Sequence, residues 1–303
     1  MQLLYALAKL RTPFLDTVLG ALTNCGGEIV FMAVAIIVFW CVSKSCGYYM
    51  LTVGFVGTIV NQFLKLVFRI PRPWVKDPDF QIVESARAEA TGYSFPSGHT
   101  QNVFASFGCL GRWTKRAWLR VVCALLIVVT AFSRMYLGVH TPLDVGVSFG
   151  IGLVLVFALY PLFRDIDSHP KRLYLLFAGM AVLSAAYLLF TELWPFPADV
   201  DAANLASGRK NAYTLLGAVL GMTFAYWLDR RYVHFDVRAV WWAQVLKTVL
   251  GLAITIGLRA ALKAPLLALC GGHNVANLIR YALTDSYTHL RAHETRGNLV
   301  CRL

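Results

Sequence analysis

The sequence has few charged residues. Asp, Glu, Lys and Arg together make up 15% of its 303 residues, against about 25% in an ordinary soluble domain. Hydrophobic residues make up 58% of the chain, and the mean hydropathy is +0.60. A disordered chain is excluded, because disorder requires low hydrophobicity and high net charge. The same shortage of charge argues against a water-soluble globule and indicates an integral membrane protein.

The sequence also lacks a cysteine pattern. Its seven cysteines are scattered along a long chain, which argues against a secreted disulfide scaffold. No group of them stands at the spacing of metal ligands. We therefore expect them to be small apolar residues in helices, and we predict neither a metal nor another cofactor.

Acidic residues are scarcer than basic ones, and the net charge is +12. Such a charge is also found in nucleic-acid-binding proteins. In a membrane protein, however, Lys and Arg gather in the cytoplasmic loops, and this alone produces a basic chain. We therefore predict a lipid bilayer and no nucleic acid as the partner. No feature of the sequence predicts an oligomeric state.

Long apolar runs are numerous. A bilayer-spanning helix needs about 20 mostly apolar residues, and a ninth candidate run begins near Asn274, after eight others. The predicted fold class is thus all-α, a polytopic transmembrane helical bundle of about eight spans. We expect residues 2–24 to form one or two short amphipathic helices at the membrane interface. Lys9 and Arg11 follow the first apolar residues, which is the wrong order for a cleavable signal peptide. We therefore expect the first span to be an uncleaved anchor. The eight runs are 29–43, 48–67, 100–112, 118–135, 143–163, 173–194, 211–228 and 240–258.

The basic residues predict the orientation of the bundle. If the spans alternate, most of the basic loops fall on one side, which should be the cytoplasm. The opposite loops, 68–99, 136–142 and 195–210, carry the acidic residues Asp77, Asp79, Glu84, Glu89, Asp199 and Asp201. Arg259 and Lys263 depart from this scheme. The basic loop residues are Lys44, Arg112, Lys115, Arg116, Arg120, Arg164, Lys171, Arg172, Arg230, Arg231 and Arg238.

Polar residues at membrane depth are costly and usually functional, and the first cluster of them here is Lys65-x6-Arg72-Pro73. Seven residues are two helical turns, so a helix would place Lys65 and Arg72 on one face. Two cations at one site suit a phosphate group. The competing interpretation is a snorkelling pair at a helix end.

The second cluster is Pro96-Ser97-Gly98-His99, which opens the 100–112 run. A helix N-terminus presents free N–H groups to an anion, and Gly98 permits a close approach of the backbone. His99 is suited to exchange a proton near neutral pH. Ser97 is equally well explained as a helix N-cap, and His99 as a structural histidine.

The third cluster is Ser133-Arg134-x5-His140-x3-Asp144. At a separation of four residues, a helix would stack His140 and Asp144 on one face. A carboxylate at one imidazole nitrogen fixes the tautomer and leaves the other nitrogen free as a nucleophile or base. Arg134 adds a fork-shaped cation. A His–Asp helix cap beside an interfacial Arg is the alternative.

The alternating spans bring the three clusters to the outer side of the membrane. Cations, two histidines, a carboxylate and a helix N-terminus then converge, which suits phosphoryl transfer. The motifs K-x6-RP, PSGH and SR-x5-H-x3-D, in this order, resemble the three signature motifs of the type-2 phosphatidic acid phosphatase superfamily. The resemblance covers about residues 50–165. It implies a six-helix phosphatase core and a plasma-membrane enzyme whose active site faces the extracytoplasmic side.

The resemblance also implies a role for each site residue. His140 would be the nucleophile that forms a phosphohistidine, Asp144 would orient it, and His99 would be the general acid. The residues implied to bind the substrate phosphate are Lys65, Arg72, Ser97, Gly98 and Arg134. Water would then hydrolyse the phosphoenzyme, and such phosphatases need no metal.

The predicted function is hydrolysis of a lipid phosphate or an isoprenoid pyrophosphate. A haloperoxidase would share the motifs, but eight spans argue against that soluble class. A transporter or flippase for a phosphorylated lipid, or a non-catalytic binder of one, is the alternative, because the later spans are not explained by a phosphatase core. The acidic loop 74–95 is either an ordinary solvated loop or a determinant of head-group choice.

The expected domain organisation has three parts. Residues 1–165 form the catalytic core and residues 166–283 form accessory transmembrane helices. Residues 284–303 are a polar tail that breaks the preceding apolar helical pattern. This tail is similar to one that recurs at the ends of translated sequencing fragments, so we expect it to be non-native; a disordered terminus is the alternative.

Overall fold

The computed structural model describes residues 1–234, 237 and 239–290, and all regular secondary structure in them is helical. The all-α prediction is therefore confirmed. Short 3-10 turns occupy Asn24–Gly26, Glu84–Ala86 and Ile166–Ser168, and π-helical turns occupy Phe104–Gly108 and Asp229–Val233. The α-helices are α1 (Gln2–Ala8), α2 (Pro13–Thr23), α3 (Glu28–Cys41), α4 (Lys44–Phe68), α5 (Pro73–Lys76), α6 (Gly98–Val103), α7 (Cys109–Trp113), α8 (Ala117–Tyr136), α9 (Pro142–Phe163), α10 (Pro170–Leu193), α11 (Ala202–Leu228), α12 (Trp241–Ala261), α13 (Lys263–Leu269) and α14 (Val275–Leu290).

Several of these helices are long and apolar enough to cross a membrane. In the described residues there are five such spans by length and composition, or six if the bent pair Pro13–Gly26 and Glu28–Cys41 counts as one. The five are Lys44–Lys76, Ala117–Tyr136, Pro142–Phe163, Pro170–Leu193 and Trp241–Leu269. Each of the eight predicted runs lies largely within helix, but the count of eight spans is not confirmed, since α11 and the short helices α6 and α7 are not among the five.

The described chain forms two compact units. The first consists of Met1–Ile36, Cys46–Asp165 and Pro197–Leu205. The second consists of Ile37–Ser45, Ile166–Phe196 and the described part of the chain from Ala206 onward. All eight predicted site residues lie in the first unit.

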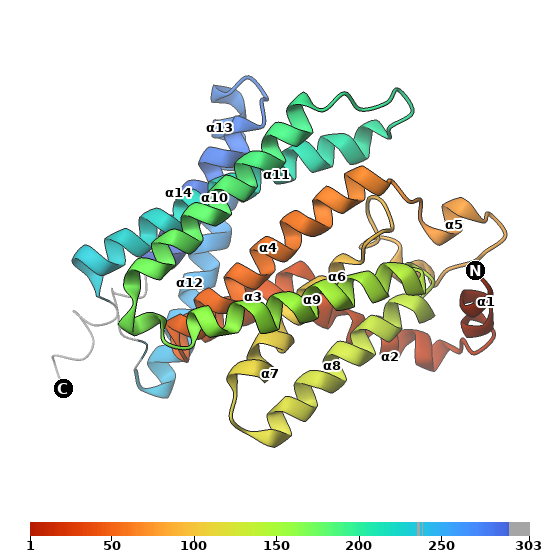
Figure 1. Cartoon of the computed structure of the whole chain (residues 1–303), viewed down its shortest axis with the longest axis horizontal. Helices are drawn as coiled ribbons and strands as arrows, with labels where there is room; N and C mark the ends of the chain where they lie inside the picture. Colours follow the sequence, from red (N-terminus) through yellow and green to blue (C-terminus); the bar gives the residue numbers. More distant parts are fainter. Residues whose placement is uncertain (235–236, 238, 291–303) are drawn as a thin grey trace. The chain divides into compact units, whose positions relative to one another are not determined.

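In the first unit, the α6 helix is the central element. It packs against α8, against α9 and against the 3-10 turn Asn24–Gly26, while α2 packs on α8 (Figure 1). The N-terminal residues 13–26, which the sequence predicts to lie at the membrane interface, therefore contact α6 and α8. A Cβ at Gly26 would overlap the backbone of His99, so only glycine permits this close approach.

Two local signals fix where the site helices begin and end. Arg69 has a left-handed backbone with φ of 50° directly after α4, and Pro71 and Pro73 follow it, so the helix cannot continue. At the other side of the site, α9 begins with Pro142 as its first residue and Thr141 as its N-cap. Proline is favoured at that position because its missing N–H would have no helical partner.

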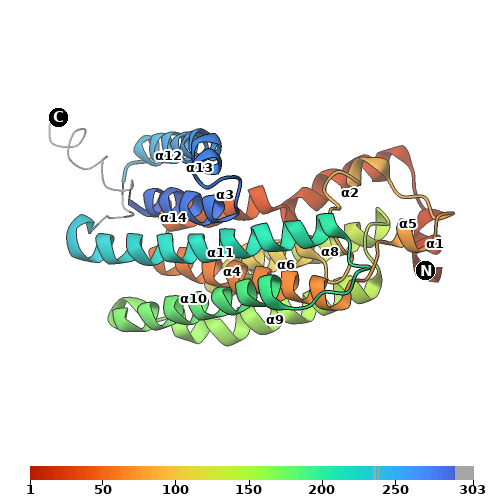
Figure 2. The ribbon, with the colours of Figure 1, turned by 90° about the horizontal axis from the view of Figure 1, so that it is seen from above.

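In the second unit, small residues allow the helices to pack closely. Tyr187 on α10 donates a hydrogen bond to the carbonyl of Gly208 on α11. On α11, a Cβ at Gly217 or Gly221 would overlap the backbone of α14, which is the close packing that a G-x3-G pattern allows. The α12, α13 and α14 helices pack on one another (Figure 2). The α14 helix includes the first residues of the predicted tail, whose remainder, 291–303, lies outside the described residues.

Candidate active site

The predicted site residues come from four places in the first unit. They lie in the last turn of α4 and the loop after it, at the start of α6, at the end of α8, and around the start of α9. His99 and Gly98 are partly exposed. The buried members are Lys65, Arg72, Ser97, Arg134, His140 and Asp144.

Lys65 and Arg72 are both in the site, but not in the predicted way. The prediction that one helix carries both is wrong, because α4 ends at Phe68 and the chain reaches Arg72 in an extended conformation. Lys65 lies in the last turn of the helix, where its Nζ donates a hydrogen bond to the carbonyl of Tyr93. Arg72 lies in the loop between α4 and α5, and its guanidinium reaches the carbonyls of Thr91 and Gly92, next to the Tyr93 carbonyl that Lys65 contacts.

The guanidinium of Arg72 connects two loops. Its Nε donates to the carbonyl of Gly92 at 3.0 Å, and its Nη2 donates to the carbonyl of Thr91 at 2.6 Å. Its Nη1 lies 2.9 Å from both the carbonyl of Val139 and Nε2 of His140. Arg72 therefore holds the loop before α6 against the loop that carries His140.

The contact with Arg72 fixes the tautomer of His140. A guanidinium only donates hydrogen bonds, so Nε2 of His140 accepts and carries no proton. The proton of a neutral ring is then on Nδ1, which lies 3.5 Å from Oδ2 of Asp144. That separation is longer than a hydrogen bond, and Nδ1 has no hydrogen-bond partner among the described residues. The unprotonated Nε2 is the nitrogen that a nucleophile requires.

Asp144 is the third residue of α9 and closes a capping box with Thr141. Its Oδ2 accepts from the backbone N–H of Thr141 at 2.7 Å, and its own N–H donates to the Thr141 hydroxyl at 3.3 Å. His140 precedes the helix, so the predicted stacking of the pair on one helical face is wrong. The capping box holds the carboxylate toward the ring instead.

Asp144 also joins the second and third clusters. Its Oδ2 accepts a hydrogen bond of 2.6 Å from the hydroxyl of Ser94, and its backbone carbonyl accepts one of 3.2 Å from the N–H of Ser97. Both Ser94 and Asp144 are buried. The carboxylate is thus fixed from the side of α6 as well as from α9.

Arg134 is the most enclosed cation of the site, with none of its surface exposed. Its Nη1 donates to the hydroxyl of Thr23 at 3.1 Å. Its Nε and Nη2 are buried and have no hydrogen-bond partner among the described residues. Buried donors are nearly always paired in proteins, so these two are suited to the oxygens of a bound anion.

The start of α6 combines a cap, an open backbone and an acid–base pair. Ser97 is the N-cap of α6, which is the alternative interpretation given in the sequence analysis. Its Oγ accepts hydrogen bonds from the backbone N–H and the hydroxyl of Thr100. A Cβ added at Gly98 would meet no atom within 4 Å, so this backbone borders open space. His99 Nε2 lies 2.9 Å from Oε2 of Glu89.

Burial and nearby cations hold both histidines neutral in the free protein. Burial, followed by the charges of Arg72, Arg134 and Lys65, lowers the pKa of His140 well below its usual range. Burial and Arg134 lower the pKa of His99 to about 4, against an opposing contribution from Glu89. A bound anion would act in the opposite direction on both rings.

Three residues of this arrangement were missed by the sequence analysis as site residues. Ser94 and Thr23 are ordinary polar residues in a loop and at a helix end, and Glu89 was considered only as part of the acidic loop. No spacing rule relates Glu89 to His99 or Thr23 to Arg134, because the contacts arise from tertiary packing. The one local signal was that Ser94 stands three residues before the predicted site residue Ser97, which could have marked Ser94 as part of the site.

The buried cations, the unprotonated nitrogen and the open backbone of Gly98 define the class of this site. In a helical, multi-pass membrane protein, these groups form a candidate anion site beside an unprotonated histidine nitrogen. Residues 44–167 match the family model of the PAP2 superfamily. Residues 213–291 match that of the PAP2 superfamily phosphatase transmembrane extension. The chain thus carries a PAP2 superfamily domain followed by a segment that matches the transmembrane extension of that superfamily's phosphatases.

The curated relatives found are named as lipid phosphatases. Undecaprenyl-diphosphatase BcrC of Bacillus subtilis is 34% identical over 35% of this chain and 52% of its own length. Phosphatidylglycerophosphatase B of Bacillus subtilis is 25% identical over 55% of this chain and 82% of its own. Lipid A 4'-phosphatase of Bacteroides thetaiotaomicron is 25% identical over 47% of this chain and 67% of its own length.

The chain thus spans about half the length of the first of these relatives. No solved structure matches the chain significantly.

Proposed function

We propose that this protein hydrolyses a lipid phosphate or an isoprenoid pyrophosphate through a phosphohistidine on His140. The main support is that the site contains both a nucleophile and free hydrogen-bond donors. Nε2 of His140 is unprotonated and can act as the nucleophile. Nε and Nη2 of buried Arg134 have no acceptor among the described residues and can bind phosphate oxygens. The names of the relatives support a phosphorylated lipid as the substrate class.

In the first step, the phosphate group enters among Lys65, Arg72 and Arg134. One of its oxygens takes over the Nη1–H of Arg72, which now lies on Nε2 of His140. The freed Nε2 lone pair attacks phosphorus, a P–N bond forms and the P–O bond to the leaving group breaks. Asp144 stabilises the positive charge that develops on the ring by facing Nδ1.

His99 supplies the proton that the leaving oxygen needs. Its pKa of about 4 in the free protein keeps it neutral, but a bound phosphate adds negative charge beside the ring and raises that pKa. The imidazolium then donates to the leaving oxygen. In the second step, neutral His99 takes a proton from water, hydroxide attacks phosphorus, and the P–N bond breaks to release inorganic phosphate.

We further propose that residues 1–165 are the catalytic core, that residues 166–283 are accessory helices, and that the site faces the extracytoplasmic side of the plasma membrane. The orientation is supported by the helical stretch that starts at Gly98 beside the site. Its far end and the turn after it carry Arg112, Lys115 and Arg116 with no acidic residue among them.

The test is phosphate release by detergent-purified protein from phosphatidic acid, phosphatidylglycerol phosphate and undecaprenyl pyrophosphate. We expect release from at least one lipid, undiminished by EDTA, and a loss of at least about 10³-fold in His140→Ala. Folded protein that binds these lipids but releases no phosphate would favour the alternative, a transporter or a non-catalytic binder. The fastest lipid would identify the substrate.

A further inference from the structure

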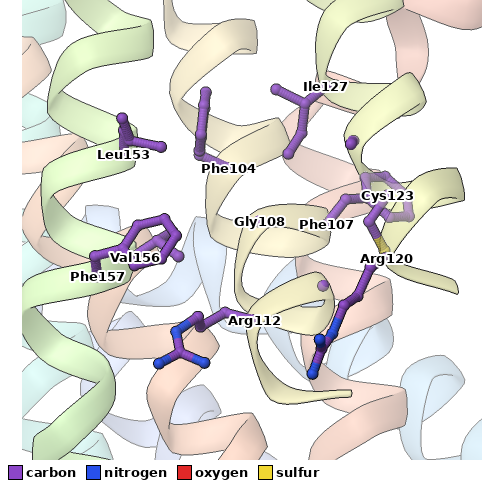
Figure 3. Close-up of a pocket in the computed structure, with 12 residues that line it drawn as sticks. Phe104, Phe107, Gly108, Arg112, Arg120, Cys123, Ile127, Leu153, Val156 and Phe157 are labelled. Carbon is purple, nitrogen blue, oxygen red and sulfur yellow. The ribbon is translucent and has the colours of Figure 1, made fainter. Parts of the chain in front are cut away.

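A cavity of about 380 Å³ lies in the first unit between the π-helical turn, α7, α8 and α9. Its volume is within the range of ligand pockets. Most of the lining is apolar, with Phe104, Ile127 and Leu153 toward one end (Figure 3). The guanidinium groups of Arg112 and Arg120 lie at the other end (Figure 3). The cavity is therefore amphipathic, with its cations gathered at one end.

Within the described part of the chain, the two arginines have no compensating charge. The guanidinium of Arg112 lies 3.8 Å from the centre of the Tyr160 ring, and its Nε is buried without a hydrogen-bond partner. Arg120 donates from Nε to the carbonyl of Thr114 at 2.9 Å. Among the described residues, no carboxylate forms an ion pair with either arginine. Both guanidinium groups retain donors for an anion.

The surroundings place the arginines at the edge of the membrane. Gly98 and Arg112 are separated by about 20 Å along the helix axis, so this cavity is distinct from the candidate active site. Trp118, two residues before Arg120 on α8, is 61% exposed, and exposed Trp is typical of the head-group level. Exposed apolar residues on the outer faces of α8 and α9, such as Val121, Leu125 and Val154, continue from the cavity toward lipid.

We propose that this cavity binds an anionic phospholipid. An acyl chain fills the apolar end, and the phosphate group of the head accepts hydrogen bonds from Arg112 and Arg120. Basic pockets between membrane helices bind anionic head groups in this way. A neutral lipid would fill the apolar end equally well but has no net charge to offset that of the arginines. The inference stands independently of the proposed function.

The test is native mass spectrometry of the purified full-length protein with phosphatidylglycerol and phosphatidylcholine of identical acyl chains. Phosphatidylglycerol is a phosphodiester, so it is not a substrate of the reaction proposed above. We expect the wild type to retain phosphatidylglycerol about tenfold or more over phosphatidylcholine. The double variant Arg112→Gln/Arg120→Gln should bring the ratio close to one.

A matched control separates the cavity from general surface charge. Lys115→Gln/Arg116→Gln removes the same amount of charge from the turn between α7 and α8, at exposed residues that do not line the cavity, and should leave the ratio unchanged. Ala124→Trp fills the exposed side of the cavity without changing charge and should reduce retention of both lipids. This variant tests the site even if the arginine variant does not fold.

Three results would overturn the proposal. A wild-type ratio near one would mean that any acyl chain fills a lipid-facing groove. An equal loss in the control pair would mean a diffuse effect of surface charge. Displacement of the lipid by inorganic phosphate at matched concentration would mean a site for the free ion rather than for a phospholipid.

Discussion

Nη1 of Arg72 lies 2.9 Å from Nε2 of His140, the nitrogen that would attack phosphorus. This contact keeps Nε2 unprotonated and excludes a tautomer with the proton on that nitrogen. It also means that the free site is occupied by its own cation, so a phosphate has to displace one hydrogen bond to enter. Arg134, whose Nε and Nη2 have no hydrogen-bond partner in the described part of the chain, would offer that phosphate a position before the displacement is complete.

Glu89 should control the alkaline limb of the pH–rate profile. The proposed mechanism requires protonated His99 in the substrate complex, so the rate falls as pH rises through the pKa of His99. The carboxylate of Glu89 raises the pKa of that ring. Glu89→Gln removes this contribution and should move the alkaline limb of kcat to lower pH by about one unit.

The acid limb reports a different group. It should follow protonation of His140, whose pKa lies well below its usual range, and Glu89→Gln should leave it in place. Glu84→Gln is the matched control, since Glu84 is exposed in the same loop and pairs with Arg87 instead. An alkaline limb that stays in place in Glu89→Gln would contradict the role of Glu89.

At the scale of elements, the sequence predicted the helices better than the contacts between them. The end of the 48–67 run and the start of the 143–163 run lie within one residue of the end of α4 and the start of α9, because apolar patterning is a local signal. Two helical-face arguments were wrong, for Lys65 with Arg72 and for His140 with Asp144, because one partner of each pair lies outside the helix.

The contacts of Ser94 with Asp144, of Glu89 with His99 and of Thr23 with Arg134 could not be predicted. Each one joins segments that no sequence spacing relates. The sequence therefore identified the charged groups of the site, whereas the groups that hold them depend on how the loop before α6 and the end of α2 pack.

The approach of α11 to α14 should depend on glycine at 221. A Cβ there would overlap the backbone of Ala282, so Gly221→Ala should destabilise the protein by about 1–3 kcal/mol. Gly179→Ala on α10 is the control, because a Cβ at that position meets no atom within 4 Å and alanine favours helix. Thermal unfolding in detergent compares the two; equal unfolding temperatures would mean that α14 does not require the close approach.

At the scale of the whole molecule, the orientation of the chain decides which side of the membrane supplies the substrate. Asp79 lies in the loop before α6 and Lys115 lies between α7 and α8, and both are exposed. We expect a membrane-impermeant maleimide to label Asp79→Cys in intact cells and to label Lys115→Cys only after permeabilisation. The parent protein provides the background from its native cysteines, and the reverse pattern would place the site in the cytoplasm.

The proposed mechanism requires that His140 becomes covalently phosphorylated during turnover. The most direct measurement is to quench the protein in alkali during turnover, where phosphohistidine is stable, and to locate the phosphoryl group by mass spectrometry. We expect it on the peptide that contains His140, and we expect none there in His140→Ala. Turnover at an undiminished rate in His140→Ala, or a phosphoryl group on another residue, would contradict the mechanism.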